Sequence, residues 1–344
     1  MKKTLLFAFA MMLTATFSLQ AQKKVMYLTF QKTLDATATT VQTDPIIQVL
    51  SADPNLSVTV KVLTSVLATD VISDLATYDV IIVQESFAGG AAMLTPAGAL
   101  ALKSIPKPFI YNKNYALQKT RALSSSTSTG AGKEADGTTS GTLLINVEAS
   151  ALTNDLFKAC TISGSNQIQL FNALSTDPGL LGAATSVKAI NYNTGLSAIP
   201  GTLLAQPAIL NAGAAVSVCI NDAPAGTTID GTETTISRGI FLGMNFGAIC
   251  ANAGKNITSD GLTIWRNAVY MLAGIEVPAT KATLPQTSIN NPYNNESSIV
   301  SEKYFTLNGI SVKEPGKGVF IKKTIFENGN VKIDKVVLAN PFTK

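Results

Sequence analysis

Short apolar runs alternate with segments of helical spacing through the first third of the chain. Four runs rich in β-branched and aromatic residues have the pattern of buried strands: residues 24–30, 56–62, 78–83 and 108–111. Between the first two, Asp44 and Pro45 open a helical pattern as its cap and its first residue. This alternation predicts an α/β fold with a doubly wound, flavodoxin-like, mostly parallel sheet.

The third run changes from apolar to polar within a few residues. Val80–Val83 is wholly apolar, and Glu85 and Ser86 follow it closely. The fourth run ends in the same way, in Asn112, Lys113, Asn114 and Tyr115. Open α/β sheets bind ligands at the carboxyl ends of their strands, so these residues predict a polar cleft with Glu85 as its candidate acid or base. The alternative is that Glu85 and Lys113 pair with each other or are solvated at the strand ends.

The second half of the main domain is richer in strand patterns. Five further runs are predicted strands: residues 143–147, 167–171, 184–190, 214–220 and 236–242. An amphipathic helix over residues 260–272 follows, with Asp260 as its cap and Gly274 at its end. The polar segment 121–141 is predicted to be a mobile loop or, alternatively, a lid over a site.

The first 22 residues have the pattern of a secretory signal peptide. Lys2 and Lys3 precede the apolar segment 5–17, and small residues precede a cleavage point before Gln22. The apolar segment is shorter than the roughly 20 residues that cross a bilayer, so a transmembrane anchor is the weaker alternative. The mature chain is therefore expected to be secreted, to the extracellular space or the outer cell surface.

Composition divides the rest of the chain into three parts. Residues 23–275 are the predicted α/β domain, residues 276–300 a linker, and residues 301–344 a small β module. The module has eight lysines and four acidic residues, whereas residues 23–300 have 16 basic and 18 acidic residues. Neither part combines clustered basic residues with interleaved aromatic ones, so nucleic-acid binding is not expected.

The chain contains no histidine. This removes the commonest general base, the Ser-His and Cys-His nucleophile pairs and most zinc sites, and no metal or cofactor is expected. Cys160, Cys219 and Cys250 are an odd number, so a disulfide framework is not the basis of the fold. Glycoside hydrolysis would need a second carboxylate beside Glu85. The candidates near loops are Asp155, Asp222 and Asp260.

The tail has a spaced pattern of strands and turns. Its turns fall at Asn308-Gly309, Pro315-Gly316 and Asn328-Gly329. Residues 304–337 resemble the C-terminal sorting domain of the type IX secretion system. The resemblance implies a β-sandwich-like module that the type IX secretion machinery recognises, and passage across the outer membrane. A generic β tail is the alternative.

Five pieces of the main domain share the pattern of a known family: residues 78–83, 107–111, 151–156, 238–243 and 265–274. They resemble the trehalose-utilisation (ThuA-like) group of the class I glutamine amidotransferase-like fold. The family's histidines are absent, with Ser150-Ala151 in place of one and Asn245 near another. The amidotransferase cysteine has no counterpart, because Asn112 and its neighbours occupy that turn. The resemblance implies the fold and makes Asn245 a further candidate binding residue, without the family's chemistry.

Two functions are compatible with these observations. The first is a secreted or cell-surface binding or structural protein without catalysis, which has a degenerate ThuA-like domain and carbohydrate as its candidate ligand. The alternative is an extracellular glycan-active hydrolase with Glu85 as its acid or base. The absence of histidine and of a nucleophile favours the first. The second predicts a deep pocket in which Glu85 lies roughly 5 to 10 Å from another carboxylate.

Overall fold

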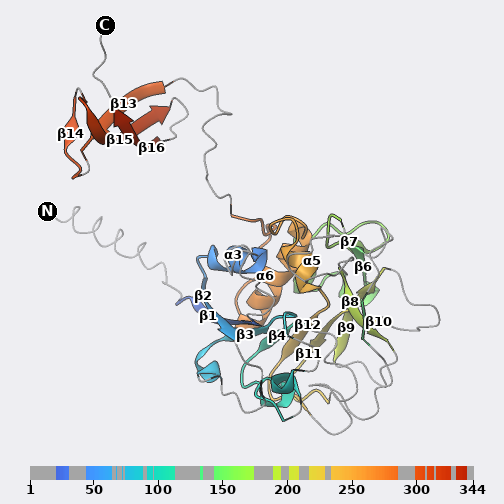
Figure 1. The fold of residues 1–344 in the computed structure, drawn as a ribbon. Helices are drawn as coiled ribbons and strands as arrows, with labels where there is room; N and C mark the ends of the chain where they lie inside the picture. The colour runs from blue at the N-terminus through green and yellow to red at the C-terminus, as the bar shows by residue number, and fades with distance from the viewer. Residues whose placement is uncertain are drawn as a thin grey trace, which may run out of the picture. The chain divides into compact units, whose positions relative to one another are not determined.

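The computed structural model divides the chain into two compact units, Met1–Pro285 and Gln286–Lys344. Figure 1 shows the elements of each unit. The structure describes residues 21–30, 44–63, 67, 72, 74–87, 91–95, 97–112, 132–134, 143–173, 189–194, 201–208, 217–228, 234–285, 299–306, 308–313, 315–326 and 331–338.

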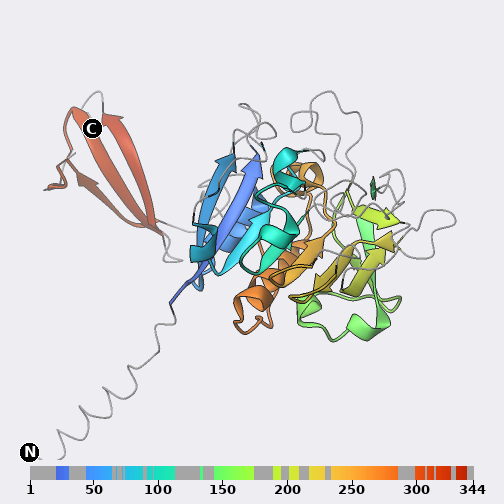
Figure 2. The ribbon, with the colours of Figure 1, turned by 90° about the horizontal axis from the view of Figure 1, so that it is seen from below.

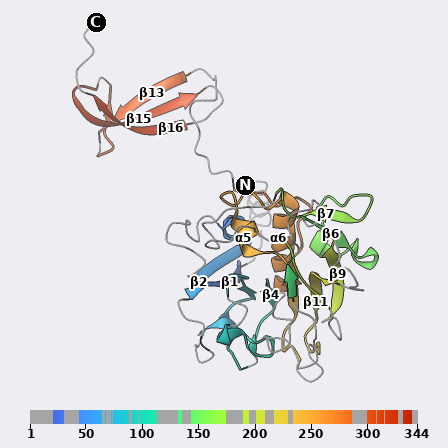
Figure 3. The same cartoon turned by 45° about the vertical axis from the view of Figure 1, so that its right-hand side comes forward.

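A nine-stranded sheet forms the centre of the first unit. Its spatial order is β2 (Leu56–Leu63), β1 (Lys23–Phe30), β3 (Val80–Val83), β4 (Phe109–Tyr111), β12 (Gly239–Leu242), β11 (Ile220–Ala223), β9 (Thr202–Pro207), β6 (Leu144–Val147) and β7 (Gln167–Gln169). Figure 3 shows β2, β1, β4, β11 and β9 in this sequence across the unit. The predicted α/β class is confirmed, and the sheet is large and mixed.

The prediction of a mostly parallel sheet holds for only half of its pairings. The strands from β2 to β12 pair in parallel, whereas those from β12 to β7 pair antiparallel. A parallel pair needs a long crossover connection, but antiparallel neighbours can follow each other through a turn. β11 and β12 are consecutive antiparallel strands, and Thr228 bridges Thr234 in the segment between them. In Figure 2 the blue and cyan parallel strands continue into the yellow and green ones.

Four of the parallel strands, β1, β3, β4 and β12, are buried on both faces, whereas the edge strand β2 is partly exposed. Successive β1 residues alternate between two core clusters, with Val25 and Tyr27 in one and Met26 and Leu28 in the other, because side chains alternate across a strand. Three α-helices cover the first face: α3 (Pro45–Ser51), α5 (Phe246–Cys250) and α6 (Ser259–Ala273). Short 3-10 turns cover the other: η3 (Ala92–Leu94) and η4 (Leu102–Ser104). Figure 1 shows these two groups on opposite sides of the strands.

The helix ends follow capping rules, with one difference from prediction. Asp44 caps α3 by accepting the Ile46 N–H at 2.9 Å, as predicted. Gly274 ends α6 at a φ of 66°, also as predicted. Thr258, and not Asp260, is the amino-terminal cap of α6, because its hydroxyl accepts the Gly261 N–H at 3.0 Å.

The remaining elements are short. Three further 3-10 turns are η2 (Leu75–Thr77), η7 (Ala149–Ala151) and η8 (Asp155–Phe157). A three-stranded antiparallel sheet has the order β10 (Ser217–Val218), β8 (Asn191–Thr194) and β5 (Gly132–Glu134). The rest of the predicted 121–141 loop lies outside the described residues. Trp265 is 1% exposed in the core, and all three cysteines are free, with Cys219 and Cys250 buried.

The second unit contains one antiparallel sheet in its described part. The order is β14 (Ser311–Val312), β13 (Ile299–Phe305), β15 (Gly318–Phe326) and β16 (Val331–Leu338). Before it, Val277 and Ala282 are buried in the first unit, within the segment expected as a linker. No helix in the described parts of either unit has the length and apolar character needed to cross a bilayer.

Candidate functional site

The end of β3 brings Glu85 next to the start of α5. The half-buried Glu85 carboxylate accepts the backbone N–H of Phe246, the first residue of α5, at 3.1 Å. This short helix follows β12, which is separated from β3 in the sheet by β4. A carboxylate is favourable at a helix start because it faces the unpaired N–H groups there. Glu85 thus links two elements that lie 161 positions apart in the sequence.

Asn112 joins the same elements from the end of β4. Its side chain is fully buried, and its amide nitrogen donates to the Gln84 Oε1 at 2.5 Å. Its amide oxygen accepts the backbone N–H of Met244 at 3.2 Å. Both ends of the Asn112 amide are therefore bonded within the protein, one to β3 and one to the segment after β12.

Asn245 has the position of a helix cap. Its side-chain oxygen accepts the Ala248 N–H at 3.1 Å, and its own N–H donates to the Ala189 carbonyl at 3.0 Å. The residue is 5% exposed. An asparagine at this position satisfies one of the orphan N–H groups of α5. Sequence reasoning placed Asn245 among the candidate binding residues, but it did not predict the helix that it caps.

Ser86 also bonds within the sheet edge. Its hydroxyl lies 3.0 Å from the Thr29 hydroxyl and accepts the Phe30 N–H at 3.0 Å. Both partners belong to the end of β1, the strand beside β3. Lys113, Asn114 and Tyr115 lie outside the described residues, so the alternative pairing of Glu85 with Lys113 stays a prediction.

A buried polar network lies behind these residues. The Gln84 side-chain amide donates to the Tyr27 hydroxyl at 2.5 Å, and that hydroxyl donates to the Asp44 carboxylate. The Gln84 oxygen accepts from the Asn112 amide and from the Glu85 N–H, the latter at 2.6 Å. Gln84, Tyr27 and Asp44 are at most 2% exposed. We call these four residues, Tyr27, Asp44, Gln84 and Asn112, the edge network.

Burial changes the acid-base behaviour of this network. Desolvation raises the pKa of the Asp44 carboxyl to about 6, although the bonds from Tyr27 and from backbone N–H groups oppose that shift. Burial, and then the negative charge of Asp44, raise the pKa of Tyr27 well above its ordinary value. The same two causes raise the pKa of the Cys250 thiol. The Cys250 thiolate, the nucleophilic form, is therefore disfavoured.

Sequence reasoning missed Gln84, Tyr27 and Asp44 as a group. Asp44 was predicted only as a helix cap, and Tyr27 only as a strand residue. The available signal was a polar side chain at an inward position of a buried strand, because buried polar groups need hydrogen-bond partners. The partners themselves come from β1, β4 and α3, which sequence spacing does not bring together.

Two of the three other candidate carboxylates form ion pairs. Asp222 forms a two-point ion pair with Arg238, with N–O distances of 3.0 and 2.6 Å. Asp260 pairs with Lys281 at 2.6 Å. Asp155 begins the 3-10 turn η8. Within the described residues, no group of three or more histidine, cysteine, aspartate or glutamate side chains is arranged to hold a metal ion.

The site is thus the carboxyl edge of β1, β3, β4 and β12, tied together by hydrogen bonds between side chains and backbone. No protein-family model matches the chain, and a search of curated proteins also finds no match. Its chemistry can therefore be argued only from its own residues.

Proposed function

We propose that this chain is an exported binding protein without catalytic activity, secreted or held at the outer cell surface. One observation carries the proposal: Glu85, Asn112 and Asn245 each accept a backbone N–H of the segment 244–248. Side chains that hold this segment are positioned for stability. We therefore infer that this polar edge, which the sequence predicted as a cleft with a candidate acid or base, serves to hold the segment 244–248 against the sheet.

The arrangement of carboxylates supports the same conclusion. A glycoside hydrolase needs one carboxyl group to give a proton while a second acts on the other side of the bond. Among the described residues, the carboxylate that hydrogen bonds connect to Glu85, through Gln84 and Tyr27, is Asp44. Asp44 is 2% exposed and is also bonded to the start of α3. A substrate could not reach Asp44 without breaking the edge network. The hydrolase alternative therefore has less support than the binding protein.

The proposal also includes the fold family of the first unit and the route by which the chain is exported. The parallel strands have the order β2-β1-β3-β4-β12, which matches the 2-1-3-4-5 order of flavodoxin-like folds. This order supports the ThuA-like, class I glutamine amidotransferase-like assignment. The separate antiparallel sheet of the second unit supports a sorting module that the type IX secretion machinery recognises. Carbohydrate is the proposed ligand class.

The test combines a binding assay and a hydrolysis assay on the chain from Gln22 to Lys344. We expect binding on a glycan array, no release of reducing sugar from the glycans bound, and the same binding by Glu85→Gln. Reducing sugar that is released by the native chain and lost in Glu85→Gln would establish the hydrolase instead. Absence of binding to every glycan would overturn carbohydrate as the ligand class.

A further inference from the structure

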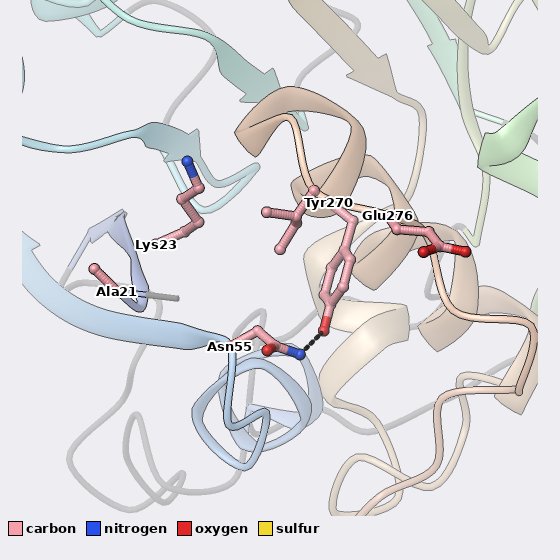
Figure 4. Close-up of a pocket in the computed structure, with 6 residues that line it drawn as sticks. Ala21, Lys23, Asn55, Tyr270 and Glu276 are labelled. Carbon is pink, nitrogen blue, oxygen red and sulfur yellow. Dashed lines mark hydrogen bonds between the residues drawn. The ribbon is translucent and has the colours of Figure 1, made fainter. Parts of the chain in front are cut away.

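A cavity of about 210 Å³ lies at the opposite edge of the sheet, where β1 begins. Its lining residues are Ala21, Lys23, Asn55, Tyr270, Ile275 and Glu276. Figure 4 shows Lys23 on one side of Tyr270 and Glu276 on the other, with Tyr270 hydrogen-bonded to Asn55. None of them belongs to the edge network or to the predicted cleft.

The polar floor of this cavity is held in place by several hydrogen bonds. The Tyr270 hydroxyl accepts from the Asn55 amide at 2.8 Å and donates to the Asp53 carboxylate at 2.8 Å. The Lys23 N–H donates to the Asn55 carbonyl at 2.8 Å. Tyr270 is 3% exposed, and burial raises its pKa to about 12, so it stays protonated as a donor to Asp53. A floor fixed in this way loses little freedom when a ligand binds.

The lining offers both kinds of hydrogen-bonding group without net charge. The Lys23 ammonium is a donor, the Glu276 carboxylate is an acceptor, and the Asn55 amide has both functions. Ile275 and the Tyr270 ring add apolar surface. A hydroxyl group is itself donor and acceptor, so a ligand with several hydroxyl groups can bond to donors and acceptors of this lining alike. An anion would meet Glu276, and a cation would meet Lys23.

With Ala21 in place, the volume admits only a small ligand. Pockets for drug-sized molecules measure roughly 300 to 1,000 Å³, which is more than this cavity offers. We propose that the cavity binds a small, neutral, polyhydroxylated ligand, on the scale of a single sugar ring. This inference deepens the proposed function and rests on it for the carbohydrate class. It also places the ligand at the amino edge of the sheet, away from Glu85.

Export would change one wall of this site. Ala21 lines the cavity, and the expected cleavage point lies between Ala21 and Gln22. Gln22 stays attached to the fold through its side-chain amide, which donates to the Pro54 carbonyl at 3.0 Å. Removal of Ala21 therefore opens the cavity at the start of β1, so the volume of about 210 Å³ is the least that the mature chain offers, and it leaves Lys23 and Asn55 in position.

The experiment is a titration of the isotope-labelled chain from Gln22 to Lys344 with a panel of free neutral monosaccharides, followed by nuclear magnetic resonance. We expect at least one sugar to shift the Asn55 side-chain amide signals in a saturable way. Lys23→Gln and Glu276→Gln should each weaken that binding about tenfold, which is the worth of one hydrogen bond to a charged group. Glu85→Gln, at the other edge, is the matched control and should bind as the native chain does.

Other outcomes separate this inference from the proposed function. Glycan binding that leaves Asn55 unshifted, or that survives both substitutions, would overturn the cavity site while the binding protein stands. Saturable shifts of Asn55 with inorganic phosphate and with no sugar would overturn the ligand class. Absence of binding to every monosaccharide and every glycan would overturn both proposals.

Discussion

The two edges of the parallel sheet use polar residues in opposite ways. At the carboxyl edge, Glu85 and Asn112 accept hydrogen bonds from backbone N–H groups after β12. The Gln84 side chain in turn accepts a hydrogen bond from Asn112. At the amino edge, Lys23 and Glu276 line a cavity whose floor is fixed by Tyr270. The comparison indicates that polar residues at a strand end form a ligand-binding site only where their hydrogen-bonding groups are not already bonded within the protein. The following predictions test that difference.

Gln84→Ala should have the largest effect on stability. The substitution removes the partner of Tyr27 and of Asn112 in a fully buried position. We expect a loss of about 3 kcal/mol or more in the free energy of unfolding, since each buried unsatisfied group costs about 1 to 3 kcal/mol. Urea denaturation of the native chain and the variant measures it. Asn55→Ala, at the exposed amino edge, is the control and should cost about 1 kcal/mol or less; equal losses would contradict the comparison.

The second prediction concerns pH and Asp44. Its pKa is raised to about 6 in the folded chain, so the folded state binds the proton more tightly than the unfolded state. The contribution to stability is fully present below the unfolded pKa, near 4, and is lost as the pH rises through about 6. The loss is on the order of 3 kcal/mol, at 1.36 kcal/mol per unit.

Asp44→Asn separates this effect from other titrating groups. Asparagine caps a helix about as well as aspartate, so α3 keeps its start. We expect the native chain to lose stability relative to Asp44→Asn between pH 4 and pH 7, measured by urea denaturation at several pH values. Parallel pH profiles for the two proteins would show that Asp44 is not held in a desolvated environment.

Glu85→Gln should have a smaller effect. Glutamine keeps an oxygen that can accept the Phe246 N–H but loses the charge that favours a helix start. We expect a loss of about 0.5 to 1 kcal/mol, which high salt would reduce. Thermal unfolding at low and high ionic strength measures it. A gain in stability would mean that the Glu85 carboxylate is strained or unpaired, as a catalytic group can be.

The sequence predicted the strands of the carboxyl edge better than the hydrogen bonds that the residues at their ends form. The change from apolar to polar after β3 and β4 correctly indicated where the strands end, because buried strands carry continuous apolar runs. It did not reveal that Glu85 and Asn112 bond to the 244–246 segment. Those partners are backbone N–H groups. Every residue except proline has one, so the residue type does not reveal which of them will be a partner. The helix α5 is five residues long, too short to show a helical period.

The antiparallel half of the sheet was harder to predict for a related reason. β9 (Thr202–Pro207) was not predicted as a strand, since it has no alternation of apolar and polar residues and ends in proline. It forms nevertheless because β11 and β6 pair with it on either side. The cavity was equally hidden: Lys23, Asn55 and Tyr270 are scattered in the sequence and meet only when β1, β2 and α6 pack.

Lys23→Gln should have the smallest effect on stability and the clearest effect on binding. Its side chain lies at the cavity, whereas the backbone N–H makes the bond to Asn55, which the substitution keeps. We expect a change within about 0.5 kcal/mol in the free energy of unfolding, as for most surface substitutions. Sugar binding should nevertheless fall about tenfold. Glu85→Gln should show the reverse pattern, with lower stability and unchanged binding. If both variants lost binding equally, the two edges would not differ in function, and the ligand would be sensed through the whole sheet.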